Sequence, residues 1–440
     1  MITAKAFAGK HYAVYGLARS GLATVKALIA SGATVTGWDS NDDARERAFD
    51  EVMEMSVDLD SAEFRVEDLD RADLSQFDSL VVTPGLPLNR HPIAQRARAA
   101  GVEIIGDIEI FARARPELPP HKVVGITGTN GKSTTTALTH HILKTAGVPT
   151  EMGGNIGLPI LAQDPLPDGG VYVLELSSYQ IDLTRSLDCD VAVLLNITPD
   201  HLDRYDDFDA YVASKVRLLD MQAGHYLQVI SRETQPTFEE YEIRWSQDHD
   251  RVIGVGVDEI ADQSRWPALQ GPHNAENAAA ATAACRLLGL TEEQVEEGLR
   301  TYPGLPHRME RVREKDGVLF VNDSKATNPT ATAPALAAFP AIRWILGGQA
   351  KTDNLDECAP HFGHVRSAYT IGEAGELFAR LLAPHMPVTN CETLENALDH
   401  AARDSQAGDT VLLSPACASF DQFKDFEQRG DRFKDLVGAL

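Results

Sequence analysis

Short apolar runs recur along the chain, and most are followed by a polar turn and then by a stretch with helical spacing. In the runs at 171–176 and 191–196 nearly all side chains are apolar, which is typical of strands buried on both faces of a parallel sheet. The pattern predicts further strands at residues 11–16, 33–38, 81–85, 101–107, 121–127, 318–321, 343–346 and 410–413. It predicts helices at residues 133–146, 209–221 and 275–288. This alternation indicates an α/β fold with mainly parallel sheets.

Two proline-rich stretches divide the chain into three domains. Pro116, Pro119 and Pro120 interrupt the pattern near residue 117, and Tyr302-Pro-Gly-Leu-Pro interrupts it again. A chain of 440 residues is also too long for one hydrophobic core. We therefore expect a Rossmann-like first domain, a central domain with a parallel sheet and a doubly wound third domain, at residues 1–117, 118–302 and 303–440.

The composition narrows the class of protein. Hydrophobic residues make up 43% of the chain and charged residues 24%, which is typical of a globular protein. We find no apolar run long enough to span a bilayer and no signal-peptide pattern. The five scattered cysteines fit buried thiols in a reducing cytoplasm better than disulfides or a zinc site. A net charge of −25 argues against nucleic acid as a partner, so an anionic substrate needs local basic residues or helix ends.

The segment 125–136, Gly-Ile-Thr-Gly-Thr-Asn-Gly-Lys-Ser-Thr-Thr-Thr, joins a predicted strand to a predicted helix. Its small residues allow backbone N–H groups to fold around an anion, and the start of the helix adds partial positive charge. Lys132 can reach the outer phosphates of a nucleotide, and the Ser133 hydroxyl can bind Mg²⁺. The alternative is a glycine-rich turn with a solvated lysine. Strand, loop and helix together favour a nucleoside triphosphate site, and ATP is the expected nucleotide.

The first predicted strand–turn–helix unit has the outline of a dinucleotide-binding motif. Gly16 and Gly21 lie in the turn, and Asp39 follows the second strand. However, Ala18 occupies the position where a middle glycine would let a pyrophosphate approach closely. The motif is therefore a weak signal for NAD, and a turn that only packs a strand against a helix is an equal alternative.

Three residues of the central domain are candidates for chemistry. Glu175 ends a predicted strand, where a carboxylate suits Mg²⁺, although it could instead cap a helix or form an ion pair. His201 follows the next strand in a Pro-Asp-His-Leu-Asp-Arg loop, where a lone histidine is more often structural. Lys215 lies among apolar residues of the predicted helix and could simply extend to solvent. Ligands of open α/β sheets lie beyond the carboxyl ends of the strands, so we expect the strand-end residues to converge on the triphosphate.

Two segments of the third domain are also dense in polar residues. Residues 322–328, Asn-Asp-Ser-Lys-Ala-Thr-Asn, follow a predicted strand and suggest a site, although a capped loop would need some of the same residues. Residues 414–426 carry Phe420, Phe423 and Phe426 at a spacing that usually indicates core. The serines of this segment could cap a helix or bind a carboxylate at its N-terminus.

These motifs in combination resemble the Mur ligases, the ATP-dependent amide-forming ligases of bacterial peptidoglycan synthesis. The resemblance runs from about residue 8 to the C-terminus, is weakest at 225–265 and is carried by residues 125–136, 153–157, 174–178, 200–204, 304–308, 322–328 and 414–419. It implies a first domain that binds the UDP part of a nucleotide-sugar, a central ATPase domain and a third domain that closes over ATP and binds an amino acid. Within the family the motifs are most similar to those of members that join D-glutamate to UDP-N-acetylmuramoyl-L-alanine. We therefore expect a monomeric cytoplasmic enzyme with these two substrates, without nucleic-acid or membrane partners.

The resemblance also implies roles for individual residues. The expected ATP contacts are Gly128, Thr129, Asn130, Gly131, Lys132, Ser133, Thr134, Asn277, Arg308 and Asp323. The expected contacts of the UDP-substrate are Ser20, Asp39, Ser40, Gly85, Asn155 and His201. One Mg²⁺ would be held by Ser133 and Glu175, and a second by His201 and a carbamylated Lys215. The residues matching the D-glutamate pocket and its surroundings are Lys325, Thr327, Lys351, Ser419 and Phe426. The expected catalytic residues are Lys132, His201 and Lys215.

Two other hypotheses compete with this one. Another member of the superfamily could add a different amino acid or extend folate with glutamate, but the first domain disfavours folate and residues 414–419 favour D-glutamate. A regulator that only binds nucleotide would be expected to have lost Glu175, His201 or Lys215, and all three are present.

Overall fold

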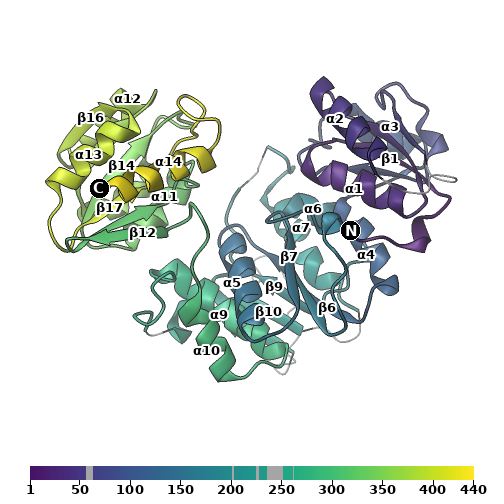
Figure 1. The fold of residues 1–440 in the computed structure, drawn as a ribbon, viewed down its shortest axis with the longest axis horizontal. Helices are drawn as coiled ribbons and strands as arrows, with labels where there is room; N and C mark the ends of the chain where they lie inside the picture. Colours follow the sequence, from purple (N-terminus) through teal and green to yellow (C-terminus); the bar gives the residue numbers. More distant parts are fainter. Residues whose placement is uncertain (56–62, 201–202, 224–226, 235–250, 261) are drawn as a thin grey trace. The chain divides into compact units, whose positions relative to one another are not determined.

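The computed structural model describes all residues of the chain except 56–62, 201–202, 224–226, 235–250 and 261. The described residues form two compact units, one from 1–256 and 277–298 and the other from 257–276 and 299–440. They contain three sheets, and helices alternate with the strands of each sheet along the sequence (Figure 1). The predicted α/β fold with mainly parallel sheets is confirmed. Among the helices of the described part, none has the length and apolar character needed to cross a membrane.

The N-terminal sheet has five parallel strands in the order β3-β2-β1-β4-β5. Its strands are β1 (His11–Tyr15), β2 (Thr34–Trp38), β3 (Phe64–Val66), β4 (Ser79–Val82) and β5 (Glu103–Ile105). Its helices are α1 (Arg19–Ala30), α2 (Asp42–Met53), α3 (Pro92–Ala99) and α4 (Asp107–Ala114). Alternate residues of β1 enter different cores: Tyr12 and Val14 pack on the side of α1, and Ala13 and Tyr15 on the side of α3. This two-sided burial explains the continuous apolar run.

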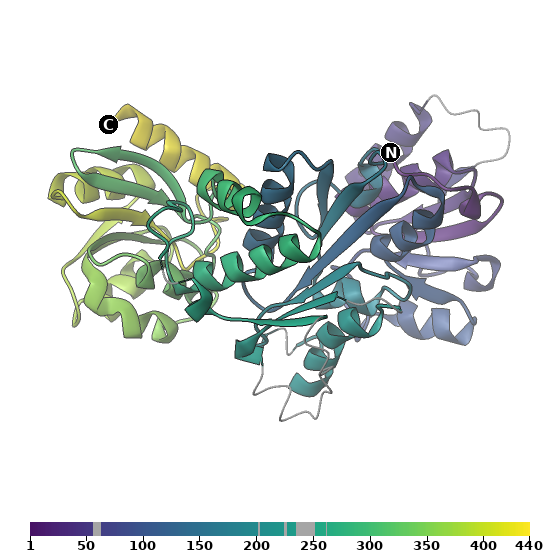
Figure 2. The same cartoon turned by 90° about the horizontal axis from the view of Figure 1, so that it is seen from below.

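The central sheet has six parallel strands in the order β11-β10-β9-β6-β8-β7 (Figure 2). The strands are β6 (His121–Thr127), β7 (Thr150–Gly154), β8 (Gly170–Glu175), β9 (Val191–Leu194), β10 (Leu227–Ser231) and β11 (Val252–Val255). The helices that follow are α5 (Lys132–Thr145), α6 (Ser178–Asp182), α7 (Phe208–Asp220), α9 (Pro272–Leu287) and α10 (Glu292–Thr301). Strand β6 lies between β8 and β9, so the loop after β6 is flanked by the carboxyl ends of both neighbours.

The C-terminal sheet has the order β12-β13-β17-β14-β15-β16. Its strands are β12 (Glu310–Lys315), β13 (Val318–Asn322), β14 (Ile342–Gly347), β15 (Val365–Ile371), β16 (Val388–Glu392) and β17 (Thr410–Leu413). Its helices are α11 (Pro329–Ala337), α12 (Gly375–Leu382), α13 (Leu394–Asp404) and α14 (Phe426–Ala439). Strand β12 is antiparallel to β13, and the other pairs are parallel. Asp316 and Gly317 join β12 to β13 with positive φ angles of 52° and 75°, the conformation of a tight hairpin turn.

Two expectations for residues 414–426 are wrong. Phe420 is 69% exposed, so it does not belong to the core. Helix α14 is capped by the Asp425 carboxylate, which accepts from the backbone N–H of Gln428 at 2.7 Å, and not by one of the preceding serines. The helix begins only at Phe426, so residues 420 and 423 lie before it and the spacing of three does not place them on one helical face.

Candidate active site

The loop between β6 and α5 has the backbone that its glycines predict. Gly131 is the N-cap of α5 with a φ of 84°, and Gly128 has a φ of 151°, so both occupy a region that side chains disfavour. A Cβ atom on Gly131 would lie 2.2 Å from Oδ1 of Asn277. Asn277, a predicted ATP contact, therefore packs directly against the loop, and Thr135 Oγ1 donates to the same oxygen at 3.1 Å.

Asn196, which follows β9, fastens this loop from one side. Its backbone oxygen accepts from the N–H of Thr129 at 2.7 Å, and its Oδ1 accepts from the N–H of Asn130 at 2.8 Å. These two N–H groups point toward Asn196. The N–H groups of the first turn of α5, Lys132 to Thr134, lack a helical acceptor four residues earlier, so they are available to an anion. Asn196 ends a predicted strand and is one of the strand-end residues expected to converge on the triphosphate, but its hydrogen bonds to the loop itself were not predicted.

Lys132 and Lys215 meet at one carbonyl oxygen. Lys132 Nζ donates to the backbone oxygens of Gly128 at 3.0 Å and of Thr129 at 2.7 Å. Lys215, on α7, donates to the Gly128 oxygen at 2.7 Å and is only 1% exposed. Burial, followed by the nearby Lys132, lowers the pKa of Lys215 well below its ordinary value. The alternative that Lys215 extends to solvent is wrong.

Glu175, the last residue of β8, is 2% exposed. Its Oε1 accepts from Nδ2 of Asn155 at 3.0 Å, and its Oε2 has no hydrogen-bond partner among the described residues. The alternatives of a cap and an ion pair do not hold: Ser177 caps α6, and no ion pair within the described part of the chain includes Glu175. A buried carboxylate oxygen without a donor fits a hard cation.

The second predicted metal site cannot be assembled in the same way. His201 lies outside the described residues, so its expected place beside Lys215 stays a prediction. As an amine, Lys215 donates a hydrogen bond to Gly128, whereas a carbamate on the same nitrogen would offer anionic oxygens. The chemistry of the pair therefore depends on that modification.

Apart from His201, which lies outside the described residues, the expected UDP contacts lie just after strands or in the first turn of the helix that follows. The Asp39 carboxylate shapes the glycine-rich turn: Oδ2 accepts from the N–H of Leu17 at 2.7 Å, and Oδ1 from the N–H of Asn41 at 2.9 Å. Ser20 lies in the first turn of α1, and Ser40 is exposed next to Asp39. Gly85, in the loop after β4, has open space where a side chain would be, so a ligand can approach its backbone.

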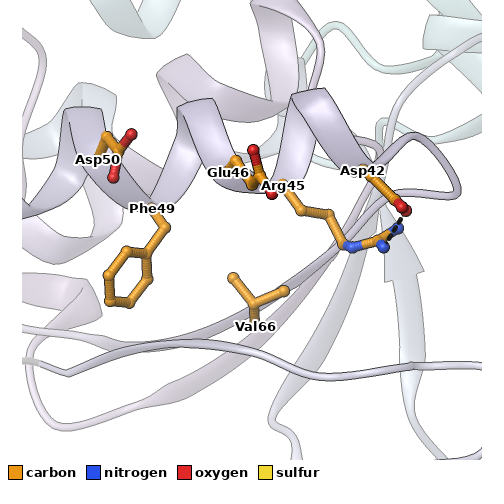
Figure 3. A pocket seen from close by; sticks show the side chains of 6 residues that line it. All are labelled: Asp42, Arg45, Glu46, Phe49, Asp50 and Val66. Carbon is orange, nitrogen blue, oxygen red and sulfur yellow. Dashed lines mark hydrogen bonds and ion pairs between the residues drawn. The ribbon is translucent and has the colours of Figure 1, made fainter.

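A pocket adjoins this region beneath helix α2 and is lined by Asp42, Arg45, Glu46, Phe49, Asp50 and Val66 (Figure 3). Arg45 forms an ion pair with Asp42 and donates to the backbone oxygen of Asp39 at 2.6 Å. Its Cζ lies 4.5 Å from the centre of the Trp38 ring. The three carboxylates of the pocket disfavour a diphosphate. The pocket therefore does not replace the strand ends as the expected site of the UDP part.

In the C-terminal unit, Asp323 follows β13 and is 4% exposed. Its Oδ2 accepts from Ser414 Oγ at 2.7 Å, and its Oδ1 accepts from the N–H of Met309 at 3.1 Å. Burial raises the pKa of Asp323 to about 7, and the nearby Arg308 opposes this shift. The two predicted ATP contacts of this unit are thus electrostatically coupled.

The predicted D-glutamate residues gather around two loops that Arg429 joins. This buried guanidinium donates to Ser324 Oγ and to the backbone oxygens of Ser324, Cys417 and Ala418, at 2.9, 2.8, 3.1 and 3.3 Å. Lys351 Nζ donates to Thr327 Oγ1 at 3.4 Å, Lys325 Nζ lies 5.4 Å from the Phe426 ring, and Ser419 is 2% exposed. Sequence reasoning missed Arg429 because its acceptors are mainly backbone carbonyls.

Three family models match the chain: "Mur ligase MurD-like, N-terminal domain" at residues 10–106, "Mur ligase middle domain" at 126–270 and "Mur ligase, glutamate ligase domain" at 307–417. Curated relatives from Novosphingobium aromaticivorans and Zymomonas mobilis are 58% and 54% identical and are aligned over 100% of this chain and 97% and 100% of their own lengths. Both are named UDP-N-acetylmuramoylalanine–D-glutamate ligase.

Solved structures share the fold at low sequence identity. UDP-N-acetylmuramate-alanine ligase from Thermotoga maritima is 17% identical with a TM-score of 0.58, and the match covers 98% of this chain and 99% of that one. The MurF ligase of the same organism, solved with ADP, is 16% identical with a TM-score of 0.59 and coverages of 98% and 96%. With matches to all three domain models and full-length relatives above 50% identity, this chain belongs to the Mur ligase family.

Proposed function

We propose that the protein joins D-glutamate to UDP-N-acetylmuramoyl-L-alanine in an ATP-dependent reaction, as a cytoplasmic monomer. The observation that carries the proposal is the convergence on one loop of Lys132 and the buried Lys215, beside the strand that ends at Glu175. The names of relatives that align with the whole chain support D-glutamate as the amino acid. The site residues below are our assignments.

The reaction requires activation of a carboxylate, which is a poor acyl donor. The L-alanyl carboxylate oxygen attacks the γ-phosphorus of ATP, the bond to the β-phosphate oxygen breaks, and ADP leaves. The D-glutamate amine then attacks the acyl phosphate, loses a proton and expels phosphate. Lys132 offsets negative charge on the transferred phosphoryl group, provided that it leaves the carbonyl oxygens of Gly128 and Thr129.

Glu175 Oε2 and the Ser133 hydroxyl are the oxygens that we assign to one Mg²⁺. A Mg²⁺ ion held by these two oxygens would supply positive charge that offsets the negative charge of the phosphates. Asn155 orients the Glu175 carboxylate through its hydrogen bond to Oε1, and it also lies among the expected contacts of the UDP-substrate. This contact would link the metal site to the acyl-donor end of the UDP-substrate.

Lys215 has the environment that a carbamate requires before it forms. A low pKa increases the neutral fraction of the amine near pH 7, and the neutral amine is the form that attacks CO₂. The N–C bond forms, the amine loses a proton, and the product is an anionic group. With His201, that group is our assignment for a second Mg²⁺.

The remaining assignments follow from the family resemblance. We assign ATP to Gly128, Thr129, Asn130, Gly131, Lys132, Ser133, Thr134, Asn277, Arg308 and Asp323. We assign the UDP-substrate to Ser20, Asp39, Ser40, Gly85, Asn155 and His201, and D-glutamate to Lys325, Thr327, Lys351, Ser419 and Phe426. The positioning of three substrates supplies much of the catalysis, and exclusion of water protects the acyl phosphate from hydrolysis.

A phosphate-release assay tests the proposal. The full chain is incubated with ATP, Mg²⁺, UDP-N-acetylmuramoyl-L-alanine and each of a panel of D- and L-amino acids. We expect phosphate release to require both the nucleotide-sugar and D-glutamate. Phosphate release with a different amino acid would reassign the substrate within the family. If none of the amino acids in the panel supported phosphate release, the proposal would be contradicted.

A further inference from the structure

Arg204 connects the central sheet to the loop that carries Gly85. Its guanidinium donates to three consecutive backbone oxygens, those of Pro84, Gly85 and Leu86, at 3.4, 3.4 and 2.9 Å. Only the contact with Leu86 has the length of a strong hydrogen bond, and the other two are weaker. All three lie within the first compact unit. One side chain from the segment between β9 and α7 thus follows the backbone of the loop after β4.

The same loop reaches back to the residue before Arg204. Asn89 Nδ2 and Arg90 Nη2 both donate to the backbone oxygen of Asp203, at 3.0 and 2.8 Å. The two segments therefore hold each other from both sides. Because donors and acceptors alternate between them, neither segment can shift without breaking contacts of the other.

An aromatic platform fixes the guanidinium of Arg204. Its Cζ lies 4.2 Å from the centre of the Tyr179 ring, and Tyr179 stacks on Tyr205 with centroids 6.0 Å apart and an angle of 14°. The Tyr205 hydroxyl donates to Asp182 Oδ2 at 2.9 Å. The guanidinium is thus held in place before any ligand binds.

The platform continues to the phosphate loop. Tyr205 meets Tyr211 edge to face with centroids 5.4 Å apart, and the Tyr211 hydroxyl lies 3.1 Å from Thr129 Oγ1. Lys215 Nζ lies 4.6 Å from the centre of the Tyr211 ring. An unbroken series of contacts therefore runs from Gly85 through Arg204 and three tyrosines to the loop assigned to ATP.

We infer that Arg204 is a positioning residue, which holds the Gly85 loop in register with the phosphate loop so that the nucleotide-sugar carboxylate meets the γ-phosphate. This inference rests on the proposed function. Misplacement of reacting groups by about 1 Å can reduce a rate by about a hundredfold. An acyl phosphate that forms in a displaced site would also be more open to water.

An arginine is required here because of its shape as well as its charge. Within the described part of the chain Arg204 forms no ion pair, and its donors go to backbone oxygens. A lysine keeps the charge but lacks the planar fork that spans several acceptors and stacks on a ring. The Arg204→Lys substitution therefore separates geometry from electrostatics.

The test compares Arg204→Lys with Arg217→Lys in the full chain. Arg217, on α7, donates to the backbone oxygen of Thr184 at 2.9 Å and, among the described residues, forms no hydrogen bond with the Gly85 loop, so it is a matched control. For Arg204→Lys we expect KM for UDP-N-acetylmuramoyl-L-alanine to rise about tenfold, while KM for ATP changes less than twofold. We also expect more phosphate than amide to be formed, a ratio that a merely structural role would not change. Titration calorimetry with UDP-N-acetylmuramoyl-L-alanine alone should show a similar loss of affinity.

Arg90→Ala gives a second test, because it removes one of the two hydrogen bonds to the Asp203 oxygen and leaves Arg204 intact. It should raise the same KM, and it carries the test if Arg204→Lys does not fold. The inference would be overturned if Arg204→Lys had wild-type values of KM, affinity and the phosphate-to-amide ratio. If Arg204→Lys does not fold, the same values in Arg90→Ala would overturn it. Wild-type protein that is inactive with these substrates would instead contradict the proposed function.

Discussion

Lys132 and Lys215 donate to the same backbone oxygen, that of Gly128, at 3.0 and 2.7 Å. Burial lowers the pKa of Lys215, and the charge of the nearby Lys132, which shares this acceptor, lowers it further. The arrangement keeps the phosphate-loop lysine on its own loop, and phosphate oxygens must compete with carbonyl oxygens for it. The two lysines are therefore the first residues to test.

Lys132→Ala should abolish turnover, with a loss of at least about a thousandfold, because the developing charge on the phosphoryl group loses its cation. Steady-state phosphate release measures the effect. Lys144→Ala, at the exposed end of the same helix, is the control and should retain wild-type activity. Substantial activity in Lys132→Ala would remove this residue from the catalytic assignment.

Lys215→Ala should be nearly inactive and partly restored by added short carboxylic acids. The acid would supply the anionic oxygens that we assign to a carbamate on Lys215. Activity is measured across a concentration series of acetate, with wild-type protein in the same series as control. An unaffected Lys215→Ala enzyme would refute the carbamate role.

Gly131→Ala should weaken ATP binding and destabilise the protein more than Gly147→Ala does. Both glycines have similar positive φ angles, 84° and 81°, so the backbone cost of about 1 kcal/mol is shared. Only at Gly131 would the new Cβ meet a neighbour, Asn277 Oδ1 at 2.2 Å, whereas nothing lies within 4 Å at Gly147. Urea unfolding and KM for ATP measure the difference. Equal effects of both substitutions would show that contact with Asn277 is unimportant.

Glu109→Ala should lower the free energy of unfolding by about 3 kcal/mol, because it removes a buried carboxylate and leaves the groups that donate to it without an acceptor. Glu109 is 1% exposed and accepts from Arg113 Nε, from the N–H groups of Arg185 and Ser186, and from Ser186 Oγ. Chemical denaturation of the full chain measures this loss. Glu63→Ala, at a solvent-exposed carboxylate, should leave the unfolding midpoint unchanged.

Asp107→Asn should change how stability depends on pH. Asp107 is 4% exposed, and burial raises the pKa of its carboxyl to about 6, above the value of about 3.9 in an unfolded chain. The folded state binds this proton more tightly, so the free energy of unfolding falls as pH rises from about 4 to about 6. Relative to wild type, the variant should gain about 1 to 3 kcal/mol between pH 4 and pH 7 in urea titrations. An identical pH dependence in both proteins would contradict this.

The sequence predicts those parts of the fold that burial controls. Strands such as 171–175 are buried on both faces and therefore show as apolar runs. Strand β12, with the sequence Glu-Arg-Val-Arg-Glu-Lys, escaped prediction because it lies at the sheet edge and its side chains are charged. The aromatic spacing at 420–426 was misleading because no helix underlies its first half.

The sequence likewise predicts some parts of the candidate site and not others. The backbone of the phosphate loop has positive φ angles that favour glycine, so the glycines in its sequence predict its structure. The contacts of Arg204 and Arg429 go largely to backbone oxygens. Every residue type provides such an oxygen, and no pattern of side chains marks where it will lie. The roles of Arg204 and Arg429 could be recognised only from the folded chain.

The contacts of Arg429 have a consequence for the behaviour of the protein at different ionic strengths. The chain carries a net charge of −25, so dissolved ions reduce repulsion among its surface carboxylates. Arg429, in contrast, is 1% exposed and holds the loops at 324 and 417–418 through neutral oxygens rather than through a carboxylate. Counterions have little access to that junction, so the geometry around the D-glutamate residues should stay constant while the electrostatics of the surface change.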